Sequence, residues 1–433
     1  PVAVLGSFEE RFLAVPAEAL ISTMKANQKY FHLVDTEGHL LPNFITIANV
    51  ESKEPVKVRA GNERVVRPRL ADAEFFWNQD RKMALAARVP ALDGVVFQKQ
   101  LGTLHHKSRR VAAIATHIAE QLMGDKQLAA RAADLCKCDL MSEMVGEFPE
   151  LQGTMGRYYA QHDGEPAEVA QAIEEHYLPR FAGDRLPDSV TGQTLAVADK
   201  LDTLVGIFAI GKIPSGDRDP FALRRAALGV LRTLIEKSLD LDLHALLTHA
   251  AAQFDPKIKA SAAVPAVFDY MMERLRAYYQ ERDIGVDVLE AVISRKPTRP
   301  LDIDRRIRAV DAFRRLPEAQ SLAAANKRIG NILKQAEAPQ ADSVDSALLK
   351  APQESALYDT LTQLSNKVNP LLASGKFDDA LKGLAGLREP VDAFFDHVLV
   401  MDEDQALRNN RVAMLGQLHK LFLRVADVSK LQS

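Results

Sequence analysis

The sequence predicts a mainly α-helical, multidomain protein with one small α+β unit at its N-terminal end. Apolar residues recur at spacings of three and four over most of residues 81–290, which is the pattern of helices that bury one face. Only two short segments, 29–34 and 44–50, have the composition of β-strands. A length of 433 residues exceeds one ordinary core and favours two to four domains.

The first predicted domain spans residues 1–80. A helix is expected over 16–24, because proline is favoured in the first turn of a helix and Pro16 stands there. The two strand segments follow, and Thr36-Glu37-Gly38 between them is a turn sequence. We therefore expect a β-hairpin in this domain.

The second predicted domain, residues 81–294, is helical. Asp125 and Asp188 stand where a side-chain oxygen would cap a helix. Two loops rich in turn-forming residues are expected at 180–187 and 212–220.

The third predicted domain spans residues 295–433 and is also helical. It opens with RKPTRP at 295–300, whose two prolines and three cations favour an extended linker. Helices are expected from residue 301 onward, and a loop is expected at 336–354. The later predicted helices cover 354–372, 378–387, 391–400 and 404–428.

The amino-acid composition and net charge limit the kinds of protein to which this chain can belong. The chain is 47% hydrophobic and 26% charged, as in ordinary globular proteins, and no apolar run reaches the ~18–20 residues of a membrane span. Cys136 and Cys138 lie too close for an ordinary disulfide, which favours a reducing, cytoplasmic location. The net charge of −3 is not the basic balance common in nucleic-acid-binding chains, but a local basic patch is sufficient for phosphate contacts.

The most informative stretch is residues 139–160, DLMSEMVGEFPELQGTMGRYYA. One helix is expected to end near Glu147-Phe148, before Pro149, and a second helix is expected to follow. Gly153 and Gly156 lie three residues apart, where the absence of Cβ atoms would let another backbone come close.

Four further segments have long, specific motifs in a matching order: 24–50, 67–80, 198–211 and 219–232. With residues 139–160 they are spread over about half the chain, from residue 24 to residue 232, and together they resemble the β subunits of bacterial heterotetrameric glycyl-tRNA synthetases. The resemblance implies a cytoplasmic, tRNA-binding subunit that recognises and positions tRNA(Gly) for ATP-dependent glycylation by an α-subunit partner. An α2β2 assembly without a membrane association is expected. In that family the segment beginning at Gly6 lies well inside the polypeptide, so with Pro1 in place of Met we expect a fragment that lacks an N-terminal portion.

Motifs of aminoacylation catalysis are not visible in the sequence. We find no HIGH-like or KMSKS-like segment, no convincing class II motif and no GxxxxGK[ST] phosphate loop. The resemblance therefore implies that this chain has no catalytic residues and no cofactor of its own, and that ATP and Mg²⁺ bind at the α subunit.

The resemblance also implies a middle domain like the HD phosphohydrolases, in which a His, a His-Asp pair and a later Asp hold a metal ion that activates water. The corresponding positions here are His105, His106, Cys138, Asp139, Asp199 and Asp202. Because Cys138 replaces the histidine of the pair, we expect a degenerate site without metal, whose aspartates cap helices or make buried hydrogen bonds. A metal-dependent phosphohydrolase is the alternative function, and a scaffold that binds only protein is a third.

Candidate tRNA contacts come from charge and position. Residues 295–315 contain eight cations and three acids, and Arg305 and Arg308 share one helical face. A solvated helix face is the alternative for this segment. Residues 325–333 resemble the family, and residues 400–411 resemble the helical anticodon-binding domain of arginyl-tRNA synthetases, where such residues contact the anticodon stem-loop.

For the arginines near 225 and 410, structural roles are the alternative. Asp219 and Pro220 are expected to begin a helix as its cap and first residue, and the two arginines that follow either contact phosphate or form ion pairs. The arginines near 410 either contact RNA or pair within a bundle. The full set of candidates is Arg224, Arg225, Arg299, Arg305, Arg306, Arg308, Arg315, Asn326, Lys327, Arg328, Asn331, Arg408, Asn409, Asn410 and Arg411.

Overall fold

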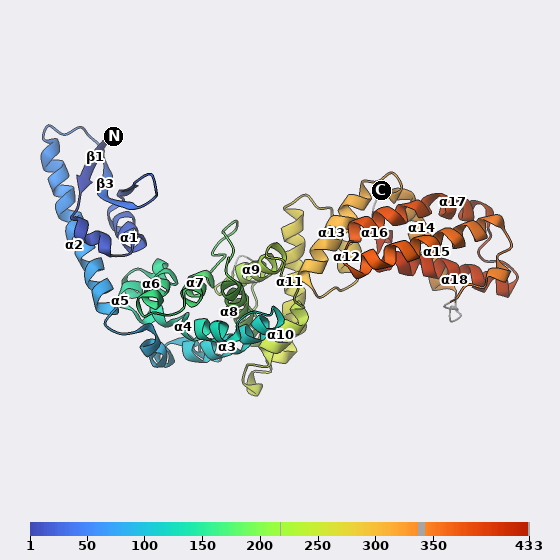
Figure 1. Cartoon of the computed structure of the whole chain (residues 1–433), viewed down its shortest axis with the longest axis horizontal. Coiled ribbons are helices and arrows are strands. Elements are labelled where there is room, and N and C mark those ends of the chain that lie inside the picture. The colour runs from blue at the N-terminus through green and yellow to red at the C-terminus, as the bar shows by residue number, and fades with distance from the viewer. Residues whose placement is uncertain (217, 337–342, 432–433) are drawn as a thin grey trace. The chain divides into compact units, whose positions relative to one another are not determined.

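The structure is a computed structural model that describes residues 1–216, 218–336 and 343–431 (Figure 1). Helices dominate the described residues and the strands form only two small sheets, which confirms the predicted mainly α class. Internal contacts divide the chain into two compact units. Unit 1 comprises Pro1–Thr233 and Leu246–Val267, and unit 2 comprises Leu234–Ala245 and Phe268–Ser433. The predicted three-domain boundaries remain a prediction.

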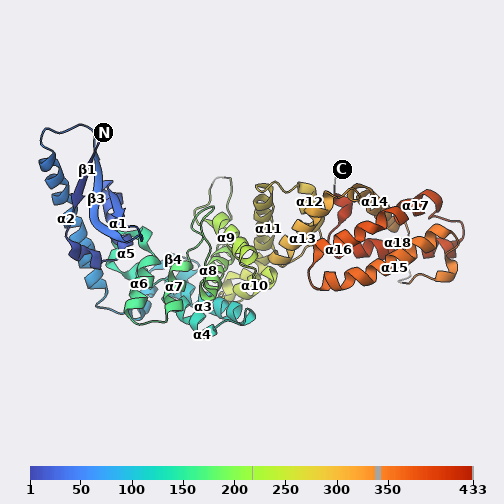
Figure 2. The same ribbon diagram turned by 45° about the horizontal axis from the view of Figure 1, so that its top comes forward.

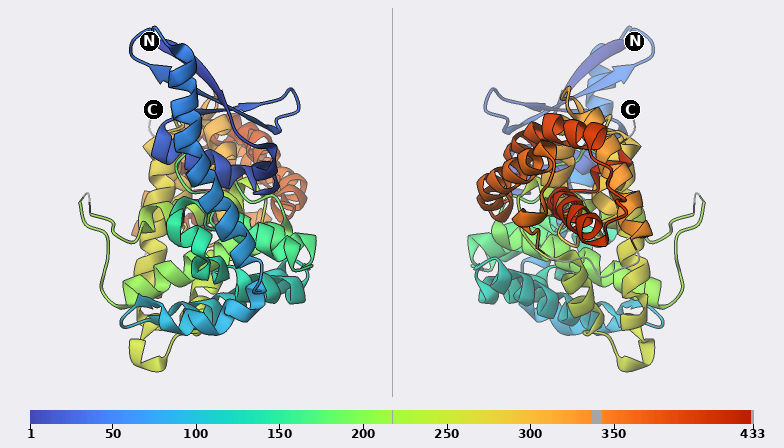
Figure 3. Two further views of the ribbon diagram at one scale, coloured as in Figure 1. Left: turned by 90° about the vertical axis from the view of Figure 1, so that its left-hand side faces the viewer. Right: turned by 90° about the vertical axis from the view of Figure 1, so that its right-hand side faces the viewer.

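Unit 1 begins with a three-stranded antiparallel sheet of order β1-β3-β2, formed by β1 (Val2–Ser7), β2 (Phe31–Val34) and β3 (Leu40–Ala48). The predicted β2–β3 hairpin is confirmed, whereas β1 was not predicted. Helix α1 (Ala17–Gln28) follows Pro16 as expected. The long helix α2 (Pro55–Asp80) packs beside β1, as the left view of Figure 3 shows.

The rest of unit 1 is helical. Helix α8 is buried along most of its length, and α3, α4 and α7 pack against it. A two-stranded sheet of β4 and β5 precedes α3. The elements are β4 (Val96–Gln98), β5 (Gly102–Thr103), α3 (Leu104–Gln121), α4 (Lys126–Leu135), α5 (Glu143–Glu147), α6 (Thr154–His162), α7 (Ala167–Glu175), α8 (Val190–Ala209), α9 (Leu223–Glu236), α10 (Leu243–Ala251) and the first residues of α11 (Val264–Gln280).

The stretch 139–160 folds as the sequence predicts. Helix α5 ends at Glu147, a short 3-10 turn begins at Pro149, and α6 begins at Thr154 after Gly153, whose φ of +83° favours glycine. A Cβ atom at Gly156 would lie 2.6 Å from Cγ2 of Ile173 on α7. The missing side chain therefore lets α6 and α7 pack closely.

Helix caps agree with the sequence in part. The carboxylate of Asp125 accepts hydrogen bonds from the backbone N–H groups of Gln127 and Leu128 at the start of α4, as predicted. The prediction for Asp188 was wrong, because the next residue, Ser189, caps α8 with its hydroxyl. Asp219 does accept from the backbone N–H groups of Leu223 and Arg224, but α9 begins at Leu223, so Pro220 lies in the preceding turn rather than in the helix.

Unit 2 is a helical bundle (Figure 2; Figure 3, right). Its core includes Phe313, Phe394 and Phe422. Within the predicted linker 295–300, residues 296–299 have no regular secondary structure and Arg299 is extended, and α13 begins at Pro300. The predicted helix 404–428 ends earlier, at Leu423. None of the described helices is long and apolar enough to cross a bilayer. The elements are α12 (Val286–Ile293), α13 (Pro300–Arg314), α14 (Ala319–Gln335), α15 (Pro352–Ala373), α16 (Phe377–Leu384), α17 (Arg388–His397) and α18 (Gln405–Leu423).

Candidate nucleic-acid interface

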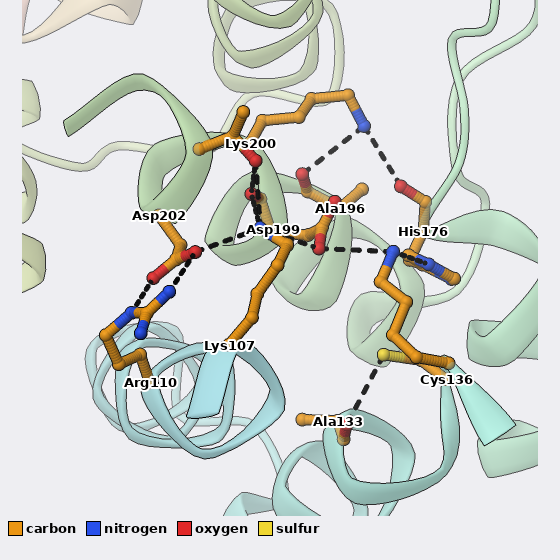
Figure 4. Close-up of polar contacts among 11 residues, drawn as sticks. Lys107, Arg110, Ala133, Cys136, His176, Ala196, Asp199, Lys200 and Asp202 are labelled. Atoms are coloured by element: carbon orange, nitrogen blue, oxygen red, sulfur yellow. Dashed lines mark hydrogen bonds and ion pairs between the residues drawn. The ribbon is translucent and has the colours of Figure 1, made fainter. Parts of the chain in front are cut away.

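Two lysines surround Asp199, one of the positions at which the HD-like resemblance implied a metal ligand. Its Oδ1 lies 3.3 Å from Nζ of Lys107 (Figure 4). The same atom lies 3.2 Å from Nζ of Lys137, and all three side chains are buried or nearly so. Burial by itself would raise the pKa of Asp199, but the two ammonium groups hold it well below its ordinary value. Asp199 is therefore a charged carboxylate that the protein itself neutralises.

Asp202 is neutralised in the same way, one helical turn further along α8. Its Oδ2 accepts a hydrogen bond of 2.9 Å from Nζ of Lys107, and Arg110 donates to both carboxylate oxygens at 2.5 and 3.2 Å (Figure 4). A two-point guanidinium contact is among the strongest hydrogen-bonded pairs in proteins. Lys107 thus bridges two aspartates of α8 from its place on α3.

The two histidines have other roles. Nδ1 of His105 lies 3.0 Å from Oδ1 of Asp93. His106 and Thr103 form a capping box at the start of α3, in which Nδ1 of His106 accepts from the backbone N–H of Thr103 at 3.2 Å. Both histidines therefore lie in the first turn of α3 and are bonded to residues that precede the helix.

Cys138 stands at the position of the missing histidine, and its side chain is buried. Burial raises the pKa of its thiol well above the ordinary value, so the metal-binding thiolate is disfavoured. Among the described residues, no group of three or more His, Cys, Asp or Glu side chains is placed to hold a metal ion. The residues present do not fit the metal of the HD phosphohydrolases, because lysines supply the positive charge at Asp199.

Asp139 stabilises the turn before α6. Its Oδ2 accepts hydrogen bonds from the backbone N–H groups of Gly153 and Gly156 at 2.5 and 3.2 Å, while Oδ1 has no hydrogen-bond donor among the described residues. Burial raises the pKa of this carboxyl to about 6, and the backbone hydrogen bonds oppose the shift. The expected buried hydrogen bonds of the aspartates are present.

We did not predict from the sequence that Lys107, Lys137 and Lys200 would lie around Asp199. Nζ of Lys200 donates to the carbonyl oxygen of His176 at 3.0 Å (Figure 4). It also donates to the carbonyl oxygen of Leu178 at 2.7 Å. Burial lowers the pKa of Lys200 to about 8; attraction to Asp199 opposes the shift, and repulsion from Lys137 and Lys107 adds to it. One signal was available, since charged residues at 199, 200 and 202 interrupt an otherwise apolar helix.

The arginines of α13 are paired with acids one turn earlier. Arg306 contacts Asp302 at 2.6 Å. The two other pairs are Arg308 with Asp304 at 2.8 Å and Arg315 with Asp311 at 2.5 Å. These i,i+4 pairs reduce the positive potential of the predicted basic stripe, although the side chains of Arg308 and Arg315 remain 71% and 72% exposed.

Three further arginines of the candidate set have different surroundings. Arg305 is exposed and has no carboxylate within ion-pair distance in the part of the chain that the structure describes. On unit 1, Arg224 and Arg225 donate to the backbone carbonyls of Gly216 and Arg180, respectively. Neither of these two forms the expected ion pair with a described acid.

Three candidates are buried, and the structure does not support them as RNA contacts. Asn326 is 1% exposed and donates to the carbonyl of Leu322. Asn410 exchanges two hydrogen bonds with the backbone of Asp345. Arg411 is 7% exposed and pairs with Glu354 and Asp402 inside the bundle. For Arg411, the alternative interpretation of pairing within a bundle is the one that the structure shows.

The remaining candidates on α14 and α18 lie at the surface. Lys327, Arg328 and Asn331 are exposed on α14, and the guanidinium of Arg328 lies 4.2 Å from the ring centre of Phe395. Asn409 is exposed near the start of α18, and the half-buried Arg408 beside it donates to the carbonyl of Asp402. These side chains can offer cations, amides and one stacked guanidinium to a partner.

Comparison with known proteins gives two family matches. Residues 1–294 match the family described as glycyl-tRNA synthetase beta subunit, and residues 322–427 match the DALR anticodon binding domain. The chain belongs to the glycyl-tRNA synthetase β-subunit family. The resemblance of the sequence to this family is therefore confirmed.

Relatives in this β-subunit family match the whole chain. Proteins named glycine–tRNA ligase beta subunit are 57% identical in Chromohalobacter salexigens, 55% in Sodalis glossinidius and 54% in Escherichia coli, each over 432 residues. The match covers 100% of this chain and 63% of each relative. The chain thus spans less than two-thirds of the length of these β subunits.

Proposed function

We propose that this chain is the tRNA-binding part of a glycine–tRNA ligase β subunit. The observation that carries the proposal is the match to an anticodon-binding domain at 322–427, within a chain whose residues 1–294 match the β-subunit family. An anticodon loop presents unstacked bases, and these are what proteins read most specifically in RNA. The surface side chains of α14 and α18 supply suitable donors and acceptors.

In this proposal the chain contributes binding and position rather than bond chemistry. It recognises tRNA(Gly) and directs the 3′ end to an α-subunit partner, where ATP, Mg²⁺ and glycine bind and glycylation occurs. The assembly is α2β2 and cytoplasmic, and this chain holds no cofactor. Holding reactants in the correct geometry can lower a barrier on the order of several kcal/mol, so a subunit without catalytic residues can still control the rate.

The phosphohydrolase alternative is weaker. It requires a divalent metal at Asp199, where Lys107 and Lys137 already neutralise the carboxylate. A second positive charge at the same oxygen would repel both ammonium groups.

The test is equilibrium binding of the chain to tRNA(Gly), to an anticodon-substituted tRNA(Gly) and to an unrelated tRNA over a series of salt concentrations. The proposal expects the tightest binding for the native anticodon and a steep fall of affinity with salt. Equal, weak binding of all three RNAs would contradict anticodon recognition. No binding to any RNA would support the scaffold alternative.

A further inference from the structure

Four arginines surround one pocket of about 410 Å³ in unit 2. The pocket lies where the 295–299 segment, the first turns of α13 and the end of α18 meet. Its charged lining residues are Arg295, Arg299, Arg306, Arg424 and Asp302. We propose that this pocket, here called the arginine pocket, binds the phosphodiester backbone of RNA at a place separate from anticodon recognition; the inference rests on the proposed function.

Two of the four arginines are committed to other groups. Nε of Arg299 contacts Asp240 at 2.8 Å, and Nε of Arg306 contacts Asp302 at 2.6 Å. The carboxylate of Asp302, the one acid in the lining, is therefore neutralised by its neighbour. These pairs hold two guanidinium groups in place while the charges of their acids are already compensated.

The other two arginines are available. Arg295 and Arg424 are both exposed, and neither has a carboxylate within ion-pair distance among the described residues. Arg424 donates to the side chain of Asn369, which is neutral. Both guanidinium groups line the same pocket, so an anion bound there would be attracted to two uncompensated positive charges.

The backbone around the pocket also favours an anion. The carbonyl ends of α18 would present negative potential, but Nη1 of Arg306 donates to the carbonyls of Arg424 and Val425 at 2.5 and 2.7 Å. The opposite end of a helix dipole, the N-terminus of α13 after Arg299, lies at the same pocket. Both helix ends are thus compatible with a phosphate group.

The segment that carries Arg295 and Arg299 is fixed before any ligand arrives. The backbone N–H of Leu243 donates to the carbonyl of Thr298 at 2.9 Å, and the hydroxyl of Thr298 donates to Asp242 at 2.6 Å. A segment that is already held in place loses less conformational entropy on binding than a mobile one. The pocket is therefore preorganised, unlike a patch of independent surface cations.

The deciding variant is Arg295→Gln/Arg424→Gln, which removes the two uncompensated charges and leaves the paired arginines intact. The control is Lys382→Gln/Arg388→Gln, which removes two exposed cations from another pocket of the same unit. The arginine pocket predicts that the first variant binds tRNA(Gly) about 10- to 100-fold more weakly. The same loss is expected for the anticodon-substituted tRNA, and the slope of log affinity against log salt should fall by about 1–2. The control should change affinity less than about 2-fold.

Phosphate ethylation interference on tRNA(Gly) gives a second measure. Wild-type chain should lose binding when particular backbone phosphates are ethylated, and one or two of these positions should become insensitive in Arg295→Gln/Arg424→Gln. Arg295→Lys/Arg424→Lys should recover part of the affinity, because lysine keeps the charge but not the planar two-point contact.

Each contrary outcome has a distinct meaning. If wild type binds tRNA and the arginine variant binds equally well, the arginine pocket is wrong and the proposed function stands. If inorganic phosphate raises the melting temperature of wild type but not of the variant, while tRNA affinity is unchanged, the pocket holds free phosphate and not RNA. If wild type binds no tRNA, both proposals are wrong.

Discussion

Lys107 contacts two aspartates of α8 at once, and the burial of all three groups makes this single side chain important for stability. Nζ of Lys107 also donates to the hydroxyl of Thr203 at 2.8 Å and to the carbonyl of Asp199 at 3.1 Å. Removing one partner from a buried ion pair leaves an uncompensated charge, which typically costs about 3–5 kcal/mol.

We therefore expect Lys107→Met to lower the free energy of unfolding by about 3–5 kcal/mol, measured by denaturant titration. Lys126→Met is the control, because Lys126 pairs with Glu120 at the surface and its loss should cost less than about 1 kcal/mol. Similar effects for the two variants would contradict the structural importance of the buried pair.

Asp139 gives a prediction for pH dependence. Its pKa in the folded chain is about 6, above the value of about 4 expected when unfolded, so the folded state binds the proton more tightly. The stabilisation from protonated Asp139 is complete below pH about 4 and is lost as pH rises through about 6. Asp139→Asn keeps an oxygen that can accept from Gly153 and Gly156 but does not titrate.

The free energy of unfolding of wild type relative to Asp139→Asn should therefore fall by up to about 3 kcal/mol between pH 4 and pH 7. Subtracting the variant removes the contributions of all other titrating groups. Denaturant titrations at pH 4, 5, 6 and 7 measure the difference, and a difference that is constant with pH would show that Asp139 keeps an ordinary pKa.

For single residues, the sequence predicts the role of a side chain better than it predicts which distant side chain it contacts. The family resemblance showed that Cys138 replaces the histidine of the pair. From that replacement we predicted that Asp139 would cap a helix or make buried hydrogen bonds. The contact of Lys107 with Asp202 joins residues 95 positions apart, and only the packing of α3 on α8 brings them together. The burial of Asn326 and Asn410 likewise depends on which helix faces meet.

Helices α6 and α7 approach closely because Gly156 has no side chain. A Cβ atom there would lie 2.6 Å from Cγ2 of Ile173 and 3.0 Å from Oδ2 of Asp139. Gly156→Ala should therefore destabilise the chain by about 1–3 kcal/mol despite the higher helix propensity of alanine.

Gly61→Ala is the matched control, because Gly61 is also inside a helix and open space surrounds the position of its Cβ. We expect this variant to be neutral or more stable by up to about 1 kcal/mol. Melting temperatures of both variants test the point, and equal stabilisation by the two alanines would exclude a close packing at Gly156.

Helices and strands were predicted correctly where neighbouring residues in the sequence determine them. The β2–β3 hairpin and the helices of unit 2 follow from turn residues and periodicity, whereas β1 needed a partner strand to be recognised. The pairing of α13 arginines was visible in advance, since acids stand four residues before Arg306, Arg308 and Arg315. Because each of these arginines is paired with the acid four residues before it, the helix is less basic than its number of cations indicates.

For the molecule as a whole, charge is close to balance, with 55 basic and 58 acidic residues. RNA affinity in the proposed function therefore depends on local clusters rather than on a general positive field. The mainly α class follows from periodicity, but the division into units does not. Leu234–Ala245 belongs to unit 2 and Leu246–Val267 to unit 1, and these changes fall inside α9, α10 and α11, where no linker composition marks them.

Different residues should therefore determine the affinity of this molecule for RNA and its preference for the native anticodon. The arginine pocket contacts phosphates, which are the same in every RNA, whereas Arg408 and Asn409 near the start of α18 are placed to contact bases in the proposed function. Arg408→Ala/Asn409→Ala should reduce the preference for native over anticodon-substituted tRNA(Gly) about 10-fold, with a change in salt slope of no more than about 1.

The control is Asn366→Ala/Lys367→Ala, which removes the same kinds of group from the exposed face of α15. It should leave the anticodon preference unchanged. If Arg408→Ala/Asn409→Ala weakens binding to both RNAs equally, these residues contact the backbone. In that case base recognition would have to come from other exposed candidates, of which Asn331 on α14 offers an amide and is the next to test.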